Sequence, residues 1–348
     1  MIRIGVLGTA SIAERRMIPA ILKCPGVEYA GVAIATREET GTDCTEEEFL
    51  PVRLRKEEKA RAFVSKFGGE AVTGYENMLR RPDIDAVYIP LPPALHFRWI
   101  LLALQYGKHV ISEKPLTISR EQSESVIREA EARGLALIEN YGFCYHRQMK
   151  LIREVIDSGR IGELRLVRAA FCFPHREESD FRYSKALGGG ALLDCGGYTV
   201  KAATAILGSH TEVVCSELTV TPGHEVDIYG SATVRNEDGL CAQLFFGMDN
   251  AYICELEISG STGSITASRA YTAPDGFKAP VIIRSGNDTQ EAAETDDQFE
   301  AVIREFTDCV EDDNRRKAEY ESMLLQSALV ERISEGAGSV RKGIHSDV

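Results

Sequence analysis

The fold of this chain is decided by its opening stretch, IRIGVLGTASIA, at residues 2–13. Residues 2–7 are mostly apolar, which indicates a short buried strand. Ser11 can cap a helix that continues to about Lys23. Gly8 therefore lies where a strand turns into a helix, and such a turn aims backbone N–H groups at the pyrophosphate of a dinucleotide. The sequence predicts a dinucleotide-binding turn at this position.

The glycine pattern of the turn departs from G-x-G-x-x-G. Gly8 keeps the first position, while Ala10 and Ala13 occupy the second and third. An alanine at the third position is an accepted variant, but Ala10 crowds the pyrophosphate by one methyl group. The motif gains weight because it opens a series of alternating strands and helices. The residues expected to contact the cofactor here are Gly8, Thr9, Ala10, Ser11 and Ile12.

The alternation of strands and helices continues along the first part of the chain. Further strands are expected at 27–35, 86–89, 109–112 and 135–138, with helices at 57–67, 94–106 and 119–133. This order is typical of a parallel sheet. Residues 38–56 interrupt it, being rich in Glu and Thr. A solvated surface loop is expected there, and a functional lid is the alternative.

The pattern changes after about Leu166. Runs with a period of two indicate an antiparallel sheet, and they lie at 212–221, 227–234, 241–246, 252–258 and 281–284. Two helices are expected near 296–310 and 320–334, followed by a loose tail over 336–348. The run 241–246 carries apolar residues on both faces, which favours an interface in a homodimer or homotetramer.

These patterns predict two domains. The first, at 1–141, is an α/β Rossmann domain with a mostly parallel sheet that binds NAD(P). The second, at 142–348, is an α+β domain with a large, open, mostly antiparallel sheet that binds substrate and forms oligomers. A chain of 348 residues is long enough for both.

Composition excludes several classes of function. The net charge of −13 argues against a nucleic-acid partner. The longest apolar stretch, near 99–104, is too short to span a bilayer, and the N-terminus shows no signal-peptide pattern, so no membrane role is expected. Nine cysteines are scattered singly without a C-x-x-C pair, which favours free thiols in a reducing cytoplasm and no metal site.

The end of the second strand normally distinguishes NAD from NADP. The chain reads AIATRE at 33–38, with Thr36 and Arg37 where an acidic residue would bind the ribose 2′-hydroxyl. An arginine can pair with a 2′-phosphate, so NADP(H) is favoured. The alternative is that Arg37 faces solvent and Glu38 binds the ribose of NAD(H).

A lysine follows the strand at 109–112. Glu113-Lys114-Pro115 lies at the carboxyl end of this strand, the edge at which parallel sheets bind ligands. The Lys114 ammonium could stabilise negative charge on a substrate oxygen beside the nicotinamide. The alternative is a surface lysine, the commoner fate of this residue type.

The stretch LGGGALLDCGGY at 187–198 is the second chemical segment. Its glycines allow close approach to a ligand, and the residues after them can start a helix. Asp194 and Tyr198 would then share one helix face. A phenol near an ammonium suits general acid–base catalysis on a carbonyl or alcohol. The alternative is a capping Asp and a buried core Tyr.

Basic residues stand in the loop before these glycines: Arg176, Arg182 and Lys185. They could hold a substrate diphosphate, because arginine suits phosphate recognition. The alternative is a solvated charged loop, since Glu177, Glu178 and Asp180 lie among them.

These motifs together resemble the Gfo/Idh/MocA-type oxidoreductases, typified by glucose–fructose oxidoreductase and inositol dehydrogenase. The resemblance covers nearly the whole chain, and Glu113-Lys114-Pro115 is its most specific motif. It implies a nicotinamide cofactor, with Lys114 and Tyr198 as the catalytic pair and Asp194 beside them. It also implies further cofactor contacts from Leu91, Pro92, His96 and Glu113. Substrate contacts are expected from Arg176, Arg182, Asp194 and Tyr198.

A closer likeness is to the nucleotide-sugar 3-ketoreductases, carried by the runs at 10–20, 89–93 and 180–183. It implies hydride transfer between nicotinamide and a sugar carbonyl or hydroxyl, in a keto-sugar reductase. The insertion at 38–56 and the pair Gly196-Gly197 depart from the family pattern and leave the substrate open. The alternatives are a dehydrogenase of a free sugar, cyclitol or dihydrodiol, and a non-catalytic, cofactor-sensing regulator.

Overall fold

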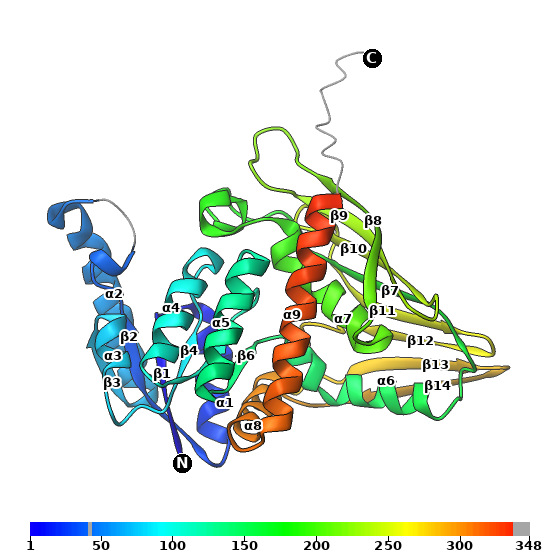
Figure 1. Ribbon diagram of the computed structural model, residues 1–348, viewed down its shortest axis with the longest axis horizontal. Helices are drawn as coiled ribbons and strands as arrows, with labels where there is room; N and C mark the ends of the chain where they lie inside the picture. Colours follow the sequence, from blue (N-terminus) through cyan, green and yellow to red (C-terminus); the bar gives the residue numbers. More distant parts are fainter. Residues whose placement is uncertain (41–43, 337–348) are drawn as a thin grey trace. The chain divides into compact units, whose positions relative to one another are not determined.

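The computed structural model describes residues 1–40 and 44–336 (Figure 1). The chain forms two compact units. The N-terminal unit comprises residues 1–117, 121–140 and 299–321, and the C-terminal unit comprises, among the described residues, 118–120, 141–298 and 322–336. Residues 337–348 of the expected tail and residues 41–43 of the expected loop lie outside the described part. The predicted boundary between 141 and 142 stays a prediction.

The N-terminal unit is built on six parallel strands in the order β3-β2-β1-β4-β5-β6, as expected of a Rossmann domain. The strands are β1 (Ile2–Leu7), β2 (Val27–Ile34), β3 (Glu70–Thr73), β4 (Ala86–Ile89), β5 (His109–Ser112) and β6 (Leu137–Glu139). Only β3 escaped prediction, because its sequence, EAVT, is short and mostly exposed.

The helices of this unit are α1 (Ile18–Lys23), α2 (Glu46–Phe67), α3 (Tyr75–Leu79), α4 (Pro93–Gln105), α5 (Arg120–Arg133), α8 (Gln298–Glu311, of which 299–311 belong here) and the first part of α9 (Asp313–Gly336, of which 313–321 belong here). The helix after Gly8 was predicted, but its start differs. Ser11 lies inside the first turn, where the Glu14 N–H donates to the Ala10 carbonyl, and does not cap it. A π turn at Ala13–Met17 precedes α1.

The prediction of a loop at 38–56 is wrong over most of the described part of this segment, because residues 46–56 belong to helix α2. α2 begins at Glu46 because Thr45 and Glu48 form a capping box, in which each side chain accepts from the other residue's backbone N–H. Phe49 and Phe63 are buried on its inner face. The acidic residues were interpreted as a sign of a loop, but Glu is also favoured in the first turn of a helix.

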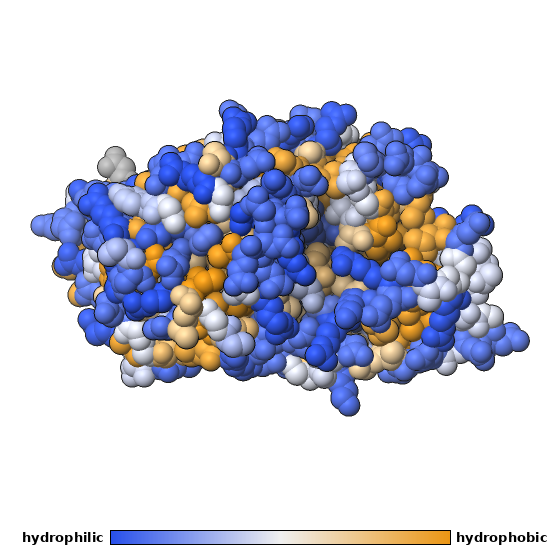
Figure 2. All heavy atoms as spheres, turned by 60° about the horizontal axis from the view of Figure 1, so that its bottom comes forward, coloured by the Kyte–Doolittle hydropathy of each residue, from blue (hydrophilic) through white to orange (hydrophobic). Residues whose placement is uncertain are grey.

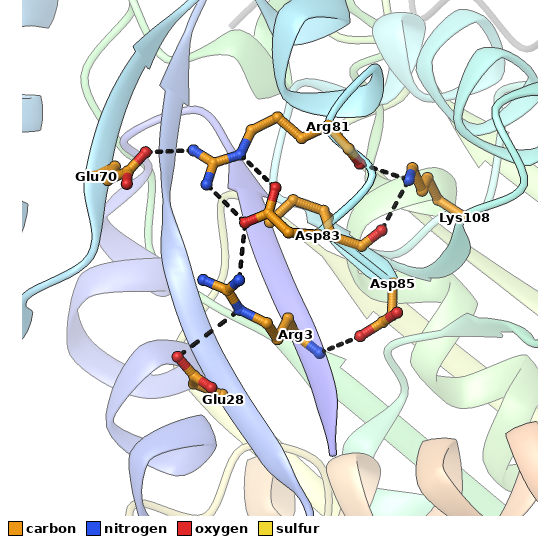
Figure 3. A network of polar contacts seen from close by, with 8 residues as sticks. Arg3, Glu28, Glu70, Arg81, Asp83, Asp85 and Lys108 are labelled. Carbon is orange, nitrogen blue, oxygen red and sulfur yellow. Dashed lines mark hydrogen bonds and ion pairs between the residues drawn. The ribbon is translucent and has the colours of Figure 1, made fainter.

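Charged side chains join the amino ends of the strands (Figure 3). Arg3 at the start of β1 pairs with Asp83 and Glu28, and Arg81 pairs with Asp83 and Glu70. Lys108 is 8% exposed, and its Nζ donates to the carbonyl oxygens of Arg81 at 2.8 Å and of Ile84 at 2.7 Å. These contacts fasten the segment between α3 and β4.

Replacing Lys108 by Met is expected to lower the free energy of unfolding by about 1–3 kcal/mol, because two buried carbonyl oxygens lose their donor. Urea unfolding measures the change. Lys150→Met is the matched control, since the Lys150 side chain is 77% exposed, and it should change the free energy by less than about 0.5 kcal/mol. Equal effects of the two variants would contradict this role for Lys108.

The C-terminal unit is built on eight strands in the order β14-β13-β12-β11-β7-β10-β9-β8. The strands are β7 (Leu164–Cys172), β8 (Thr211–Thr219), β9 (Tyr229–Asn236), β10 (Cys241–Gly247), β11 (Ile253–Gly260), β12 (Gly263–Ser268), β13 (Ala279–Ser285) and β14 (Asp288–Glu294). Only β7 and β10 pair in parallel, so the predicted, mostly antiparallel sheet is confirmed. β7, β12 and β14 escaped prediction, the last two because their residues are small or polar.

Helices pack against this sheet from its core side. α7 (Gly197–Leu207) contacts β7, β9 and β10, and α6 (Arg147–Asp157) contacts β13 and β14. The last turns of α9 (Asp313–Gly336) reach β8, where Ser216 Oγ donates to the Ile333 carbonyl. Tyr320 starts the predicted second helix, whereas α9 begins seven residues earlier at Asp313.

Strand β10 alternates more regularly than its composition indicated. Ala242, Leu244 and Phe246 are buried, whereas Gln243 and Phe245 are exposed. Phe245 is the large apolar residue that this strand leaves at the surface, 36% exposed. In the view of Figure 2, polar residues cover most of the surface and apolar atoms show between them in patches. Within the described residues, none of the helices is long and apolar enough to cross a bilayer.

Candidate active site

Gly8 forms the turn after β1 in the N-terminal unit. Its φ is +103°, and an added Cβ would lie 3.0 Å from Leu91 Cδ2 and 3.3 Å from Tyr75 Oη. Its N–H donates to the Ala33 carbonyl, which ties the turn to β2. Glycine is the residue that suits both the positive φ and the lack of space for a Cβ at this position. Thr9, Ala10 and Ile12 are half-buried and Ser11 is exposed beyond it.

The end of β2 carries a carboxylate that the sequence did not single out. Glu39 is 8% exposed and accepts from the Thr36 N–H at 2.9 Å, and from the Tyr75 and Glu76 N–H groups at 2.9 and 3.0 Å. These bonds hold the Thr36 backbone against the start of α3. Glu39 is therefore committed to backbone donors.

Arg37 lies next to this carboxylate with its side chain 38% exposed. Its guanidinium contacts Glu38 Oε1 at 3.0 Å, Glu46 Oε2 at 3.7 Å and the Cys44 carbonyl at 3.1 Å. The hydrogen bond to Glu38 is the main cause that raises the pKa of Arg37. Glu38, the alternative ribose ligand, is thus paired with the cation beside it.

His96 connects the segments that follow β4 and β5. It is fully buried, and its Nδ1 and Nε2 each lie 2.7 Å from a backbone carbonyl oxygen, of Pro115 and of Leu91 respectively. Burial lowers the pKa of His96, and the Lys114 charge adds to this effect. The contacts with the Pro115 and Leu91 backbone oppose it, because they raise the pKa. Pro92 lies between Leu91 and the start of α4. His96 thus fixes the segment that carries Lys114.

Glu113 gathers the ends of three neighbouring strands. Its Oε1 accepts from Tyr88 Oη of β4 at 2.6 Å and from Asn140 Nδ2, just after β6, at 2.7 Å. Its N–H donates to the Ile89 carbonyl. Burial raises the pKa of Glu113, and the bonds from Tyr88 and Asn140 oppose this shift. Lys114 therefore follows a residue held by its side chain and its backbone.

In the C-terminal unit, residues 191–207 form one helix, as predicted, with a π turn at Leu192–Gly196 before α7. Asp194 lies in the π turn and Tyr198 in the first turn of α7. Gln326 Nε2 donates to the Gly197 carbonyl at 2.8 Å. The helix is thereby fixed next to Tyr198.

Tyr198 is half-buried among aromatic rings. Ring centroids lie 5.1 Å away for Tyr141 and Phe171, 5.9 Å for Phe143 and 6.1 Å for Tyr271. The rings meet edge-on or tilted, which is the favourable arrangement for aromatic pairs. This cluster confines the phenol to one orientation.

Asp194 is paired with an arginine. Arg182 Nε donates to Asp194 Oδ2 at 2.7 Å, and Arg182 Nη1 contacts Asp180 Oδ1 at 3.1 Å. Burial alone lowers the pKa of Arg182, but the two carboxylates outweigh it and raise the pKa. Arg176 lies apart from this network. Its guanidinium carbon is 4.9 Å from the centroid of the Phe173 ring, and its backbone N–H donates to Tyr183 Oη.

The structure therefore gathers the predicted residues in two sets. Gly8, Leu91, His96, Glu113 and Lys114 belong to the N-terminal unit. Asp194, Tyr198 and Arg182 belong to the C-terminal unit. Among the groups that the sequence missed, Asn140 could have been found, because it directly follows a buried strand at the ligand-binding edge. Glu39 stood in the segment interpreted as a loop.

Two family models match the chain. Residues 2–141 match the oxidoreductase family with an NAD-binding Rossmann fold, and residues 149–266 match the GFO/IDH/MocA C-terminal domain.

Similar proteins are known in sequence and in structure. The chain is 38% identical over 340 residues to dTDP-3,4-didehydro-2,6-dideoxy-alpha-D-glucose 3-reductase of Actinomadura kijaniata, covering 97% of this chain and 96% of that one. It is 27% identical over 336 residues to D-xylose 1-dehydrogenase (NADP(+)) 2 of Haloferax volcanii, covering 96% of each chain.

A solved relative is KijD10, a 3-ketoreductase from Actinomadura kijaniata in complex with NADP and TDP-benzene. Its TM-score is 0.87 at 38% identity, covering 98% of this chain and 99% of that one. KijD10 has also been solved with a lysine replaced by alanine and with a tyrosine replaced by phenylalanine. The replaced lysine and tyrosine are 84 residues apart in the sequence of KijD10, and Lys114 and Tyr198 are also 84 residues apart in this sequence. The chain belongs to the GFO/IDH/MocA family of oxidoreductases.

Proposed function

We propose that this enzyme reduces the C3 keto group of a dTDP-linked deoxysugar, with NADPH as the hydride donor. One observation carries the proposal. Lys114 and Tyr198 have the same spacing in the sequence as the lysine and the tyrosine that were replaced in KijD10. The chain is similar to that ketoreductase over nearly its whole length.

The N-terminal unit fits a dinucleotide phosphate. Gly8 leaves space that a Cβ would fill, and its turn precedes a helix, where backbone N–H groups favour anions. Arg37 offers a partly exposed cation at the end of β2, the place of the adenosine ribose in Rossmann folds. Glu39 is committed to backbone N–H groups and is not available to a ribose 2′-hydroxyl. These features favour NADP(H) over NAD(H).

The reaction assigns separate tasks to two side chains. When bound, NADPH supplies the hydride that reduces the carbonyl carbon. The Lys114 ammonium donates a hydrogen bond to the carbonyl oxygen and stabilises the negative charge that develops there. Tyr198 Oη gives its proton to the same oxygen. The aromatic rings around Tyr198 cover part of the phenol ring.

Asp194 is assigned a role in positioning the sugar. Its Oδ2 is held by Arg182, so the carboxylate has a fixed direction and can accept from substrate hydroxyls. Arg182 is neutralised by two carboxylates, which favours this supporting role over binding of the diphosphate. Arg176, which forms no ion pair within the described contacts, remains the better diphosphate candidate of the two.

Replacing Arg37 by Ser is expected to weaken NADPH binding roughly 10- to 100-fold and to leave NADH binding within about twofold, because only the 2′-phosphate loses a charge-assisted partner. Quenching of cofactor fluorescence measures both dissociation constants. Arg61→Ser, an exposed change on α2, is the control. Equal weakening of both cofactors by Arg37→Ser would contradict the assignment.

A substrate panel tests the function itself. NADPH oxidation is followed at 340 nm with dTDP-linked 3-keto sugars and with the corresponding free sugars, and NADP+ reduction is followed with free aldoses. The proposal expects turnover of the nucleotide-linked ketone at least tenfold above the free sugar. Equal rates would remove the nucleotide requirement.

A second candidate is a dehydrogenase of a free sugar, favoured by the similarity to the NADP(+)-dependent D-xylose 1-dehydrogenase of Haloferax volcanii. Rapid reduction of NADP+ with a free aldose, without turnover of the dTDP-linked ketone, would establish it.

The exposed Phe245 on β10 supports the expectation that two copies meet through this sheet, as a homodimer or as part of a homotetramer. Light scattering in solution measures the number of chains. The nine cysteines form no disulfide bond with one another.

A further inference from the structure

The helix that carries Asp194 and Tyr198 receives its N-terminal cap from a distant residue. The helix begins after Gly190, which has no side chain to accept from the first free N–H groups. Asp227 lies 35 residues beyond Leu192, and its Oδ2 accepts from the Leu192 N–H at 2.7 Å. The Asp227 carbonyl accepts from the Ala191 N–H at 2.8 Å. Asp227 thus satisfies two donors of the first turn.

Gly190 is shaped for this contact. Its φ is +122°, and a Cβ added to it would lie 2.5 Å from Asp227 Oδ1. A side chain at this position would displace the carboxylate. The last glycine of the triplet and Asp227 are therefore matched to one another.

The capped turn leads directly to the residues assigned to the reaction. The Asp194 N–H donates to the Gly190 carbonyl at 3.0 Å, and Tyr198 follows one turn later. We propose that Asp227 is a positioning residue, which fixes the first turn of the helix at 191–207 and thereby the placement of Asp194 and Tyr198. Its effect on turnover rests on the proposed function, whereas its effect on the helix does not.

The charge of Asp227 gives this cap a signature. Burial raises the pKa of Asp227 to about 6. The backbone N–H groups of Leu192, Asp227 itself and Ala191 oppose this shift, because they lower the pKa. The titratable groups of the helix are Asp194, Cys195, Tyr198 and Lys201, and those of the loop segment paired with its start are Arg182 and Asp180. Within the described contacts, none of them bonds to Asp227.

The sign of the pH effect follows from the raised pKa. The capped state holds the proton more tightly than an opened state with the ordinary Asp value of 3.8. Protonation therefore favours the capped state. Lowering the pH from about 7.5 to about 5 should reduce the opening constant of the first turn about tenfold.

Hydrogen exchange of the peptide at 187–198, read by mass spectrometry and corrected for intrinsic rates, tests the proposal. Asp227→Ala should raise the opening constant roughly 5- to 150-fold, because the Leu192 N–H loses its acceptor. Asp227→Asn keeps an acceptor oxygen, so it should restore protection and abolish the pH dependence. Asp238→Asn, in the exposed turn before β10, is the control and should leave exchange unchanged.

Turnover supplies the second readout. Asp227→Ala should lower kcat roughly 10- to 100-fold with KM for NADPH unchanged, and Asp227→Asn should recover most of the loss. Should the alanine variant fail to fold, the pH series on the unaltered protein decides. Protection unchanged in Asp227→Ala, or independent of pH in the unaltered protein, would overturn the proposal. The expected exchange pattern without any turnover of keto sugars would instead count against the proposed function alone.

Discussion

Replacing Tyr198 by Phe is expected to lower kcat for reduction of the keto sugar roughly 10²–10⁴-fold, the usual contribution of a positioned general acid. The phenylalanine ring keeps the contacts with Tyr141, Phe143, Phe171 and Tyr271, so the aromatic cluster should stay intact. Only the transferable proton is removed. Single-turnover measurement of NADPH oxidation at 340 nm reports the chemical step directly.

The control for this variant is Tyr252→Phe, which removes the hydroxyl of a tyrosine that is 43% exposed and directly precedes β11. It should leave kcat unchanged. NADPH affinity should be unaltered in both variants. Full turnover by Tyr198→Phe would show that another group supplies the proton.

Replacing Lys114 by Met is expected to lower kcat/KM roughly 10²–10³-fold, because the developing negative charge on the substrate oxygen loses its nearest cation. Methionine has a similar length and keeps the packing of the stem. The segment itself should hold its shape, since His96 and Glu113 fix it through other atoms. Steady-state kinetics with varied keto sugar measures the change.

Lys150→Met removes an exposed lysine from α6 and serves as the matched control for the loss of one positive charge. Its kcat/KM should stay within about threefold of the unaltered value. A Lys114→Met variant with undiminished kcat/KM would leave this ammonium without a chemical role.

The local part of this structure could be predicted from the sequence. Apolar runs ended by glycine or proline placed β1, β4 and β5 at or near their observed bounds, because buried parallel strands have a strong and simple pattern. The same logic placed Lys114 at the carboxyl end of β5. Gly8 was identifiable because a tight strand-to-helix turn requires its backbone freedom.

Several contacts could not be predicted because the two partners are distant in the sequence. Arg182 was named as a candidate phosphate ligand with a solvated loop as the alternative, and its guanidinium donates to Asp194, a pairing that the sequence did not indicate. The cap that Asp227 gives to Leu192 leaves no local signal at all. The helix start at Thr45 was visible as a capping box, but the acidic residues around it were weighed as loop composition.

His96 and Glu113 show why the family motif extends beyond its lysine. The imidazole is buried between two carbonyl oxygens and the carboxylate between a phenol and an amide. Neither pattern can be inferred from residue type alone. Together they indicate that the Lys114 backbone is held rigid, as an oriented cation requires.

The central claim is that Lys114 and Tyr198 act on one and the same substrate oxygen. A double-mutant cycle in single-turnover NADPH oxidation, with Lys114→Met, Tyr198→Phe and both together, tests it most directly. The account predicts strong non-additivity, with the double variant no more than about tenfold slower than the slower single variant. Effects that simply multiply, to within about twofold, would contradict it.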